Sequence, residues 1–172
     1  FDSLFAHQIM EVSKINSLVE LFFKKLEEVD NKKPLLNSLR SEKKIYNWSD
    51  ISERIFKLSS KIKKLIKSGD KCLILSENNP NWFISDISIM NAGGISVPIF
   101  TTYSANDYKF ILKDCNPTLV IVSNNTQFEK IKEFVNDKSI EIISFEKIDT
   151  KSYLIEDIFK DTSNDKIINN NL

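Results

Sequence analysis

Between residues 71 and 123, three short runs of aliphatic residues alternate with two segments that carry helix signals. The runs cover residues 72–75, 95–100 and 119–122, and each has the length of a strand that is buried on both faces. Each connection between them is long enough for a crossover helix. The pattern predicts an α/β fold with three layers, in which helices cover both faces of a mostly parallel sheet.

Local signals place the helices and one sheet edge within this stretch. Asn79 followed by Pro80 predicts the start of one helix, and Ser104 with Asp107 predicts the start of the next. We expect the first of these helices to bury an apolar face made of Trp82, Phe83, Ile87 and Met90. Pro98 cannot donate a backbone hydrogen bond, so it predicts an edge, an end or a bulge in its strand.

The segment before this stretch predicts two helices and a short N-terminal β-hairpin. A capping box of Ser17 and Glu20 opens a helix whose apolar stripe is Leu18, Leu21, Phe22, Leu26 and Val29. Residues 35–48 predict the hairpin, with a charged turn at 40–43. Asn47 caps the second helix, which we expect to end at Gly69.

After the third aliphatic run the signals predict one more helix, a strand and a short final helix. Thr126 and Glu129 predict a capping box, a strand follows over residues 140–145, and a short helix lies near 153–159. We therefore divide the chain into an arm over residues 1–16, one domain over 17–160 and a polar tail or linker over 161–172.

Composition excludes several classes of partner. Lys and Arg together number 24, as do Asp and Glu, so the zero net charge predicts no nucleic-acid partner. No run approaches the apolar length of a membrane span, and no signal peptide opens the chain. The two cysteines are far apart in sequence, which favours a reduced, cytoplasmic setting, and without a basic amphipathic helix we expect membrane contact to be at most peripheral. Because the first residue is Phe1, we expect a trimmed or excised piece of a longer protein.

The residues themselves indicate no active site. The loop after the first parallel strand reads SENNPNW and has no glycine, and the last glycine of the chain is Gly94. A glycine-rich loop that cradles phosphate cannot be built from that sequence. Cys72 is expected to be an inert core thiol, and a helix C-terminus would raise the pKa of Cys115. The only histidine, His7, lies in the arm, away from a rigid scaffold.

Acidic residues are also better explained by structure than by catalysis. Asp50, Asp107 and Glu129 each fall where a helix is predicted to start, a position that favours negative charge. The pair of Trp82 and Phe83 is expected to be core more than a ligand platform.

One stretch nevertheless resembles a known family. The segments YNWSDI, GDKCLILSENNPNWFISDISIMNAGGISVPIFTTYSANDYKFILKDCNPTLVIVS and FEKI are similar to the N-terminal portion of AMP-forming acyl-CoA synthetases, in the adenylate-forming ligase superfamily. The order of residues in these segments is most similar to the long-chain fatty acid–CoA ligase branch. The resemblance covers residues 17–160.

The resemblance implies an enzyme that uses ATP to activate a carboxylic acid as an acyl-adenylate and then transfers the acyl group to coenzyme A. The family's phosphate loop and catalytic lysine have no match here, so we expect this chain to be inactive alone and to bind no cofactor by itself. The parent enzyme would use ATP, Mg²⁺ and coenzyme A. The turn after the Val-Pro strand, Phe100, Thr101 and Thr102, would border the coenzyme A side, unless it is a plain strand-to-helix turn.

Partners follow from the same resemblance, and two other readings stay open. We expect the remainder of the ligase chain as partner, with fatty acid and coenzyme A in the parent enzyme, and we leave a homodimer open. The chain could instead be a free-standing α/β module that binds protein or a small ligand without catalysis. A regulatory remnant that pairs with an intact synthetase is the third reading. Acyl chain length is not readable from these residues.

Overall fold

The computed structural model describes residues 15–38, 44–135 and 139–161 of the chain. His7 and the predicted hairpin turn at 40–43 lie outside these ranges. So do the predicted arm, apart from residues 15 and 16, and the predicted tail, apart from residue 161.

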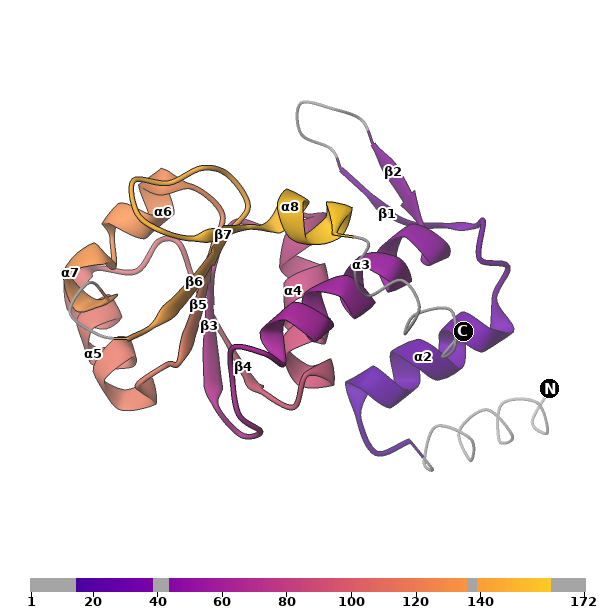
Figure 1. Ribbon diagram of the computed structural model, residues 1–172, viewed down its shortest axis with the longest axis horizontal. Helices are drawn as coiled ribbons and strands as arrows, with labels where there is room; N and C mark the ends of the chain where they lie inside the picture. The colour runs from indigo at the N-terminus through magenta and orange to yellow at the C-terminus, as the bar shows by residue number, and fades with distance from the viewer. Residues whose placement is uncertain (1–14, 39–43, 136–138, 162–172) are drawn as a thin grey trace.

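The described residues alternate helices and strands along the chain (Figure 1). The helices are α2 (Leu18–Glu28), α3 (Trp48–Ile62), α4 (Pro80–Asn91), α5 (Ala105–Cys115), α6 (Asn125–Glu129), α7 (Lys132–Val135) and α8 (Ile155–Lys160). The strands are β1 (Pro34–Asn37), β2 (Ile45–Asn47), β3 (Lys71–Leu75), β4 (Ile95–Ile99), β5 (Leu119–Val122), β6 (Glu141–Ser144) and β7 (Tyr153–Leu154).

Five strands form one parallel sheet in the order β4-β3-β5-β6-β7, and β1 pairs with β2 as an antiparallel hairpin. The predicted fold class, a parallel sheet covered by helices with a short N-terminal hairpin, is confirmed. Strand β4 is at one edge, as Pro98 predicted, so the missing backbone N–H of this residue costs the sheet no central hydrogen bond.

The sheet separates two apolar cores. Cys72 and Ile74 of β3 face the core shared with α2, α3, α4 and α8, while Leu73 and Leu75 face the core shared with α5, α6 and α7. Figure 1 shows the two groups of helices on opposite sides of the sheet. All four of these β3 side chains are fully buried, which is what the continuous aliphatic run predicted.

Side-chain caps fix where the main helices begin. Asn47 and Asp50 form a reciprocal capping box at α3, and Ser104 and Asp107 form another at α5. The hydrogen bonds from Ser104 lower the pKa of Asp107, which keeps its carboxylate ionised at the positive end of the helix. Asn79 accepts from the backbone N–H of Trp82 to start α4.

The apolar faces of two helices differ from the prediction. In α2, Leu18 and Leu21 are exposed, and Phe22 and Leu26 carry the buried face. In α4, three residues of the predicted apolar face, Trp82, Phe83 and Met90, are only partly buried. The fully buried aliphatic residues of this helix are Ile84 and Ile89. Small serines in α4 allow it to pack closely on α3, and Ser88 Oγ donates to the carbonyl of Ile55 at 3.2 Å. Trp82, Phe83 and Met90 pack against the margin of that same core.

Several predicted boundaries were wrong for identifiable reasons. Helix α3 ends at Ile62 instead of Gly69, and the chain then makes a turn before Gly69, which adopts a positive φ of 85°. The capping box of Thr126 and Glu129 does not form, because Asn124 already caps the helix two residues earlier. Glu129 therefore lies at the end of α6, where it pairs with Lys132. Strand β7 was not predicted, since two residues carry no periodic signal.

The described part of the chain contains no helix that combines the length and apolar character needed to cross a membrane.

Removing the α3 cap should destabilise the domain measurably. In Asn47→Ala the backbone N–H of Asp50 loses its acceptor, and we expect the free energy of unfolding in urea to fall by about 1 kcal/mol. Asn106→Ala is the matched control, because this exposed asparagine lies inside the first turn of α5 and caps nothing. An equal loss in both variants would contradict the role of Asn47.

Candidate functional site

The carboxyl ends of β3 and β4 open into a cleft with a volume of about 580 Å³. Ligands of doubly wound sheets bind at this end of the strands, beside the point where the strand order reverses. The order here reverses around β3, whose neighbours β4 and β5 both follow it in sequence. The cleft is lined by Ser76, Glu77, Asn78, Trp82, Pro98, Ile99, Phe100 and Thr101.

The loop on one side of the cleft, residues 76–79, is ordered by side chains instead of glycines. Asn79 Nδ2 donates to Ser76 Oγ at 3.1 Å and to the carbonyl of Glu77 at 2.9 Å, and Ser76 Oγ donates to that same carbonyl at 2.8 Å. These bonds join side chains and one carbonyl oxygen within the loop, whereas a glycine-rich phosphate loop directs backbone N–H groups at its ligand. That the loop is no phosphate cradle stays a prediction from its lack of glycine.

The carboxylate of Glu77 accepts hydrogen bonds from side chains that follow β5 and lie in α6. Ser123 Oγ donates to Oε2 at 2.6 Å, and Gln127 Nε2 donates to Oε1 at 2.7 Å. Hydrogen bonds to a charged group contribute about 1.5–3 kcal/mol each. With both oxygens engaged, Glu77 acts as a structural brace between the loop after β3 and the loop after β5.

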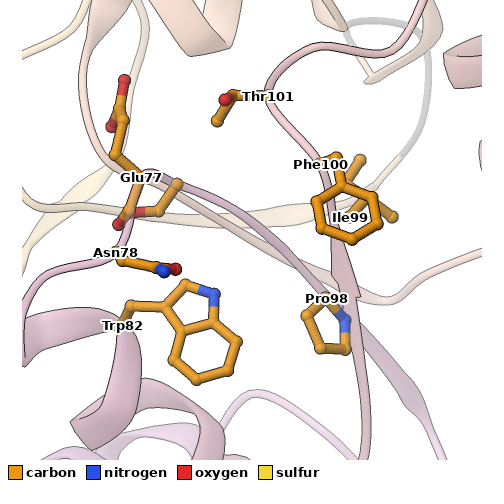
Figure 2. A pocket seen from close by; sticks show the side chains of 8 residues that line it. Glu77, Asn78, Trp82, Pro98, Ile99, Phe100 and Thr101 are labelled. Carbon is orange, nitrogen blue, oxygen red and sulfur yellow. The ribbon is translucent and has the colours of Figure 1, made fainter.

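The other side of the cleft is the turn after β4 that sequence analysis singled out. Phe100 and Thr101 line the cleft, whereas Thr102 is the next residue along the turn, exposed to solvent and outside the lining. Figure 2 shows Trp82 on one side and Pro98 and Phe100 on the other, with Thr101 above them. Phe100 is 68% exposed, so most of its apolar side chain is open to solvent.

Two hydrogen bonds from side chains outside the turn hold it in place. Tyr108 Oη donates to the carbonyl of Phe100 at 3.0 Å, and Lys130 Nζ donates to the carbonyl of Thr101 at 2.7 Å. Burial raises the pKa of Tyr108, which keeps the hydroxyl protonated and able to donate. Tyr103 packs edge-to-face on Phe100 with ring centroids 5.4 Å apart.

Sequence reasoning missed Trp82 as a cleft residue and missed the brace at Glu77. Trp82 was assigned to the core on its aromatic character, and it does pack against the core while one part lines the cleft. The spacing Pro-x-Trp places this ring in the first turn of α4, directly after the loop that ends β3, and that position was the available signal. The brace spans 46 and 50 residues, so no local pattern could reveal it.

The other candidate groups do not form a catalytic constellation. Burial, followed by the nearby charge of Asp70, raises the pKa of Cys72 to about 12. Asp50 and Asp107 lie at helix starts, as predicted, and their carboxylates accept from the backbone N–H of the caps Asn47 and Ser104. Within residues 15–38, 44–135 and 139–161, no three or more His, Cys, Asp or Glu side chains gather in a way that could hold a metal ion.

Comparison with known proteins assigns a family to this arrangement of sheet and cleft. Residues 25–168 match the model of the AMP-binding enzyme family. The chain belongs to that family.

Individual relatives agree with the family match. The chain is 30% identical over 124 residues to long-chain-fatty-acid–CoA ligase ACSBG1 of Rattus norvegicus, which covers 69% of this chain and 16% of that protein. It is 41% identical over 54 residues to ACSBG2 of Gallus gallus, covering 31% of this chain and 7% of that protein. The chain thus spans less than a fifth of the length of these curated relatives.

A solved structure supports the fold. A putative long-chain-fatty-acid CoA ligase from Rhodopseudomonas palustris CGA009 superposes with a TM-score of 0.74 at 15% identity, over 87% of this chain and 37% of that one. At that identity the likeness concerns the fold alone.

The thiol of Cys72 should resist alkylation in the folded chain. With a pKa of about 12 instead of 9.0, the thiolate fraction at pH 8 falls from about one in ten to about one in ten thousand. We expect iodoacetamide to label Cys72 at pH 8 only after unfolding, as measured by peptide mass spectrometry. Because the unfolded thiol ionises near pH 9 and the folded thiol near pH 12, the stability linked to this thiol is fully present below about pH 9 and is lost as the pH rises toward 12. Rapid labelling of Cys72 in the native chain would contradict its buried, protonated state.

Proposed function

We propose that this chain is the N-terminal portion of a long-chain fatty acid–CoA ligase. In the whole enzyme a carboxylate oxygen would attack the α-phosphorus of ATP and release pyrophosphate, and the coenzyme A thiol would then attack the acyl carbonyl and release AMP. The observation that carries the proposal is the family match over residues 25–168, and the named rat and chicken relatives support the long-chain branch.

Within that enzyme we assign the cleft to the coenzyme A side, with Phe100, Thr101 and Thr102 at its border. Coenzyme A carries phosphates at one end and an uncharged chain of amides and methylenes that ends in the thiol. None of the described residues that line the cleft is a lysine or arginine, and the charged group among them is the Glu77 carboxylate. Such a lining favours the uncharged arm over the phosphates, because an unpaired phosphate near a carboxylate is repelled. Trp82 and Phe100 offer apolar walls for the methylene groups.

ATP and Mg²⁺ are assigned to parts of the enzyme outside these residues. The loop after β3 directs its polar groups to one another, and the sequence has no glycine after Gly94. A phosphate-binding loop rich in Ser, Thr and Gly would follow in the longer chain. The catalytic lysine of the family likewise has no counterpart here.

These 172 residues should therefore not form an acyl-adenylate by themselves. We expect ATP–pyrophosphate exchange with a long-chain fatty acid to stay at the level of a protein-free blank, with an intact acyl-CoA ligase as positive control. Exchange above the blank would contradict the assignment of ATP chemistry to later residues. The reading frame that continues past Leu172 gives an independent check, because the proposal requires a Ser/Thr/Gly-rich loop within a few dozen codons.

In the enzyme that contains this chain, Phe100→Ala should weaken coenzyme A binding selectively. Loss of one aromatic wall is expected to raise KM for coenzyme A about tenfold, since burying a large apolar side chain contributes about 1.5–3 kcal/mol. Pyrophosphate exchange needs no coenzyme A and should not change. Phe110→Ala is the matched control, because Phe110 is 70% exposed on α5 and does not line the cleft. If Phe100→Ala impaired pyrophosphate exchange as much as it impaired the reaction with coenzyme A, the role of Phe100 would be refuted.

A further inference from the structure

One short segment contacts both sides of the cleft. Gln127 in α6 and Lys130, the C-cap of that helix, are three residues apart, and residues at this spacing lie on the same face of a helix. Gln127 donates to the Glu77 side chain on one side of the cleft, and Lys130 donates to the Thr101 carbonyl on the other. Both bonds measure 2.7 Å.

The contact at Glu77 is doubled and partly buried. Gln127 is only 4% exposed, and its neighbour in space, Ser123, donates to the second oxygen of the same carboxylate. Two hydrogen bonds from separate groups hold one carboxylate more firmly than a single bond does. The loop after β3 is therefore fixed relative to α6.

The contact at Thr101 holds the turn at residues 100–103, which has few backbone hydrogen bonds of its own. Across the turn, the backbone N–H of Tyr103 donates to the Phe100 carbonyl at 3.5 Å, which is long for a hydrogen bond. The shorter bonds to the turn come from Lys130 and from Tyr108 in α5. The position of Thr101 thus depends on the ammonium group of a lysine 29 residues away.

We propose that Gln127 and Lys130 are positioning residues, and that together they set the separation between the loop at Glu77 and the turn at Phe100. The pair, which we call the α6 clamp, determines how wide the cleft is for the ligand that enters it. That the ligand is coenzyme A rests on the proposed function, whereas the width of the cleft is a property of this chain alone.

The clamp can be tested without any ligand, using Trp82 as a reporter inside the cleft. The sequence has two tryptophans, so Trp48→Phe leaves Trp82 as the single emitter. In this background Lys130→Met keeps the aliphatic stem and removes the donor, and we expect acrylamide to quench Trp82 more strongly. Lys130→Arg should restore quenching to the starting level, because its guanidinium can still donate to a carbonyl.

Lys132→Met is the matched control. Lys132 lies two residues further on, pairs with Glu129 on the surface and contacts neither side of the cleft. Lys132→Met removes the same positive charge as Lys130→Met. Because Lys132 does not contact the cleft, quenching of Trp82 should stay unchanged. If Lys130→Met and Lys132→Met quench alike, the clamp is refuted.

Hydrogen exchange locates the change. In Lys130→Met, the backbone amide of Tyr103, which donates to the Phe100 carbonyl across the turn, should exchange about tenfold faster, the effect expected when one hydrogen bond of ordinary strength is lost, while amides of β5 keep their rates. A uniform acceleration across the domain would refute a local clamp and indicate general destabilisation. Should Lys130→Met fail to fold by circular dichroism, Lys130→Leu, which also has neither donor nor charge, takes its place under the same criteria.

The outcomes separate the clamp from the proposed function. A change in Trp82 quenching with Lys130→Met supports the clamp even if Phe100→Ala leaves KM for coenzyme A unaltered. Conversely, a coenzyme A effect at Phe100 with no change in quenching refutes the clamp and leaves the ligase proposal in place.

Discussion

The structure depends on the burial of β3 between two cores. Its alternating side chains enter opposite apolar layers, so both groups of helices are attached to the same four residues, Cys72, Leu73, Ile74 and Leu75. Parallel pairing with β4 on one side and β5 on the other then brings the carboxyl ends of three strands to one edge. The loops that leave this edge diverge to opposite faces of the sheet, and the cleft opens beside the point where they separate. The position of the cleft is thus a consequence of where β3 is buried.

The sequence predicted most of the fold because the fold is encoded locally. Continuous aliphatic runs identified the central strands, Pro98 identified the sheet edge, and the caps at Asn47, Asn79 and Ser104 identified three helix starts. Failures occurred where packing competes with local preference. Trp82 is apolar enough for a core, yet the serines of α4 pack so closely on α3 that the ring remains at the cleft. Likewise, Thr126 resembles a cap, but Asn124 is nearer the end of β5 and accepts from the backbone N–H of Gln127.

The site was only half accessible to sequence reasoning. The turn at Phe100 and Thr101 could be predicted because it directly follows a strand with a family-like pattern. The residues that contact the two sides of the cleft, Glu77 in one segment and Gln127 and Lys130 together in α6, come from two other segments, and nothing in the spacing of the chain shows that a glutamine 50 residues away meets Glu77. The loop at residues 76–79 contains polar side chains and no glycine. Asn79 and Ser76 order this loop by bonds within it, and the Glu77 carboxylate accepts from Ser123, directly after β5.

The same reasoning explains why a helix as short as α6 can organise the cleft. Five residues do not form a stable helix by themselves, so α6 depends on tertiary contacts. Phe128, which is fully buried, attaches it to the core beneath α5 and α7, and this anchor lies between Gln127 and Lys130 in sequence. A polar contact on each side of a buried aromatic residue transmits the rigidity of the core to two segments that have little regular structure. Phe128 therefore fixes α6 to the core, and the hydrogen bonds from Gln127 to Glu77 and from Lys130 to Thr101 fix the two sides of the cleft relative to α6.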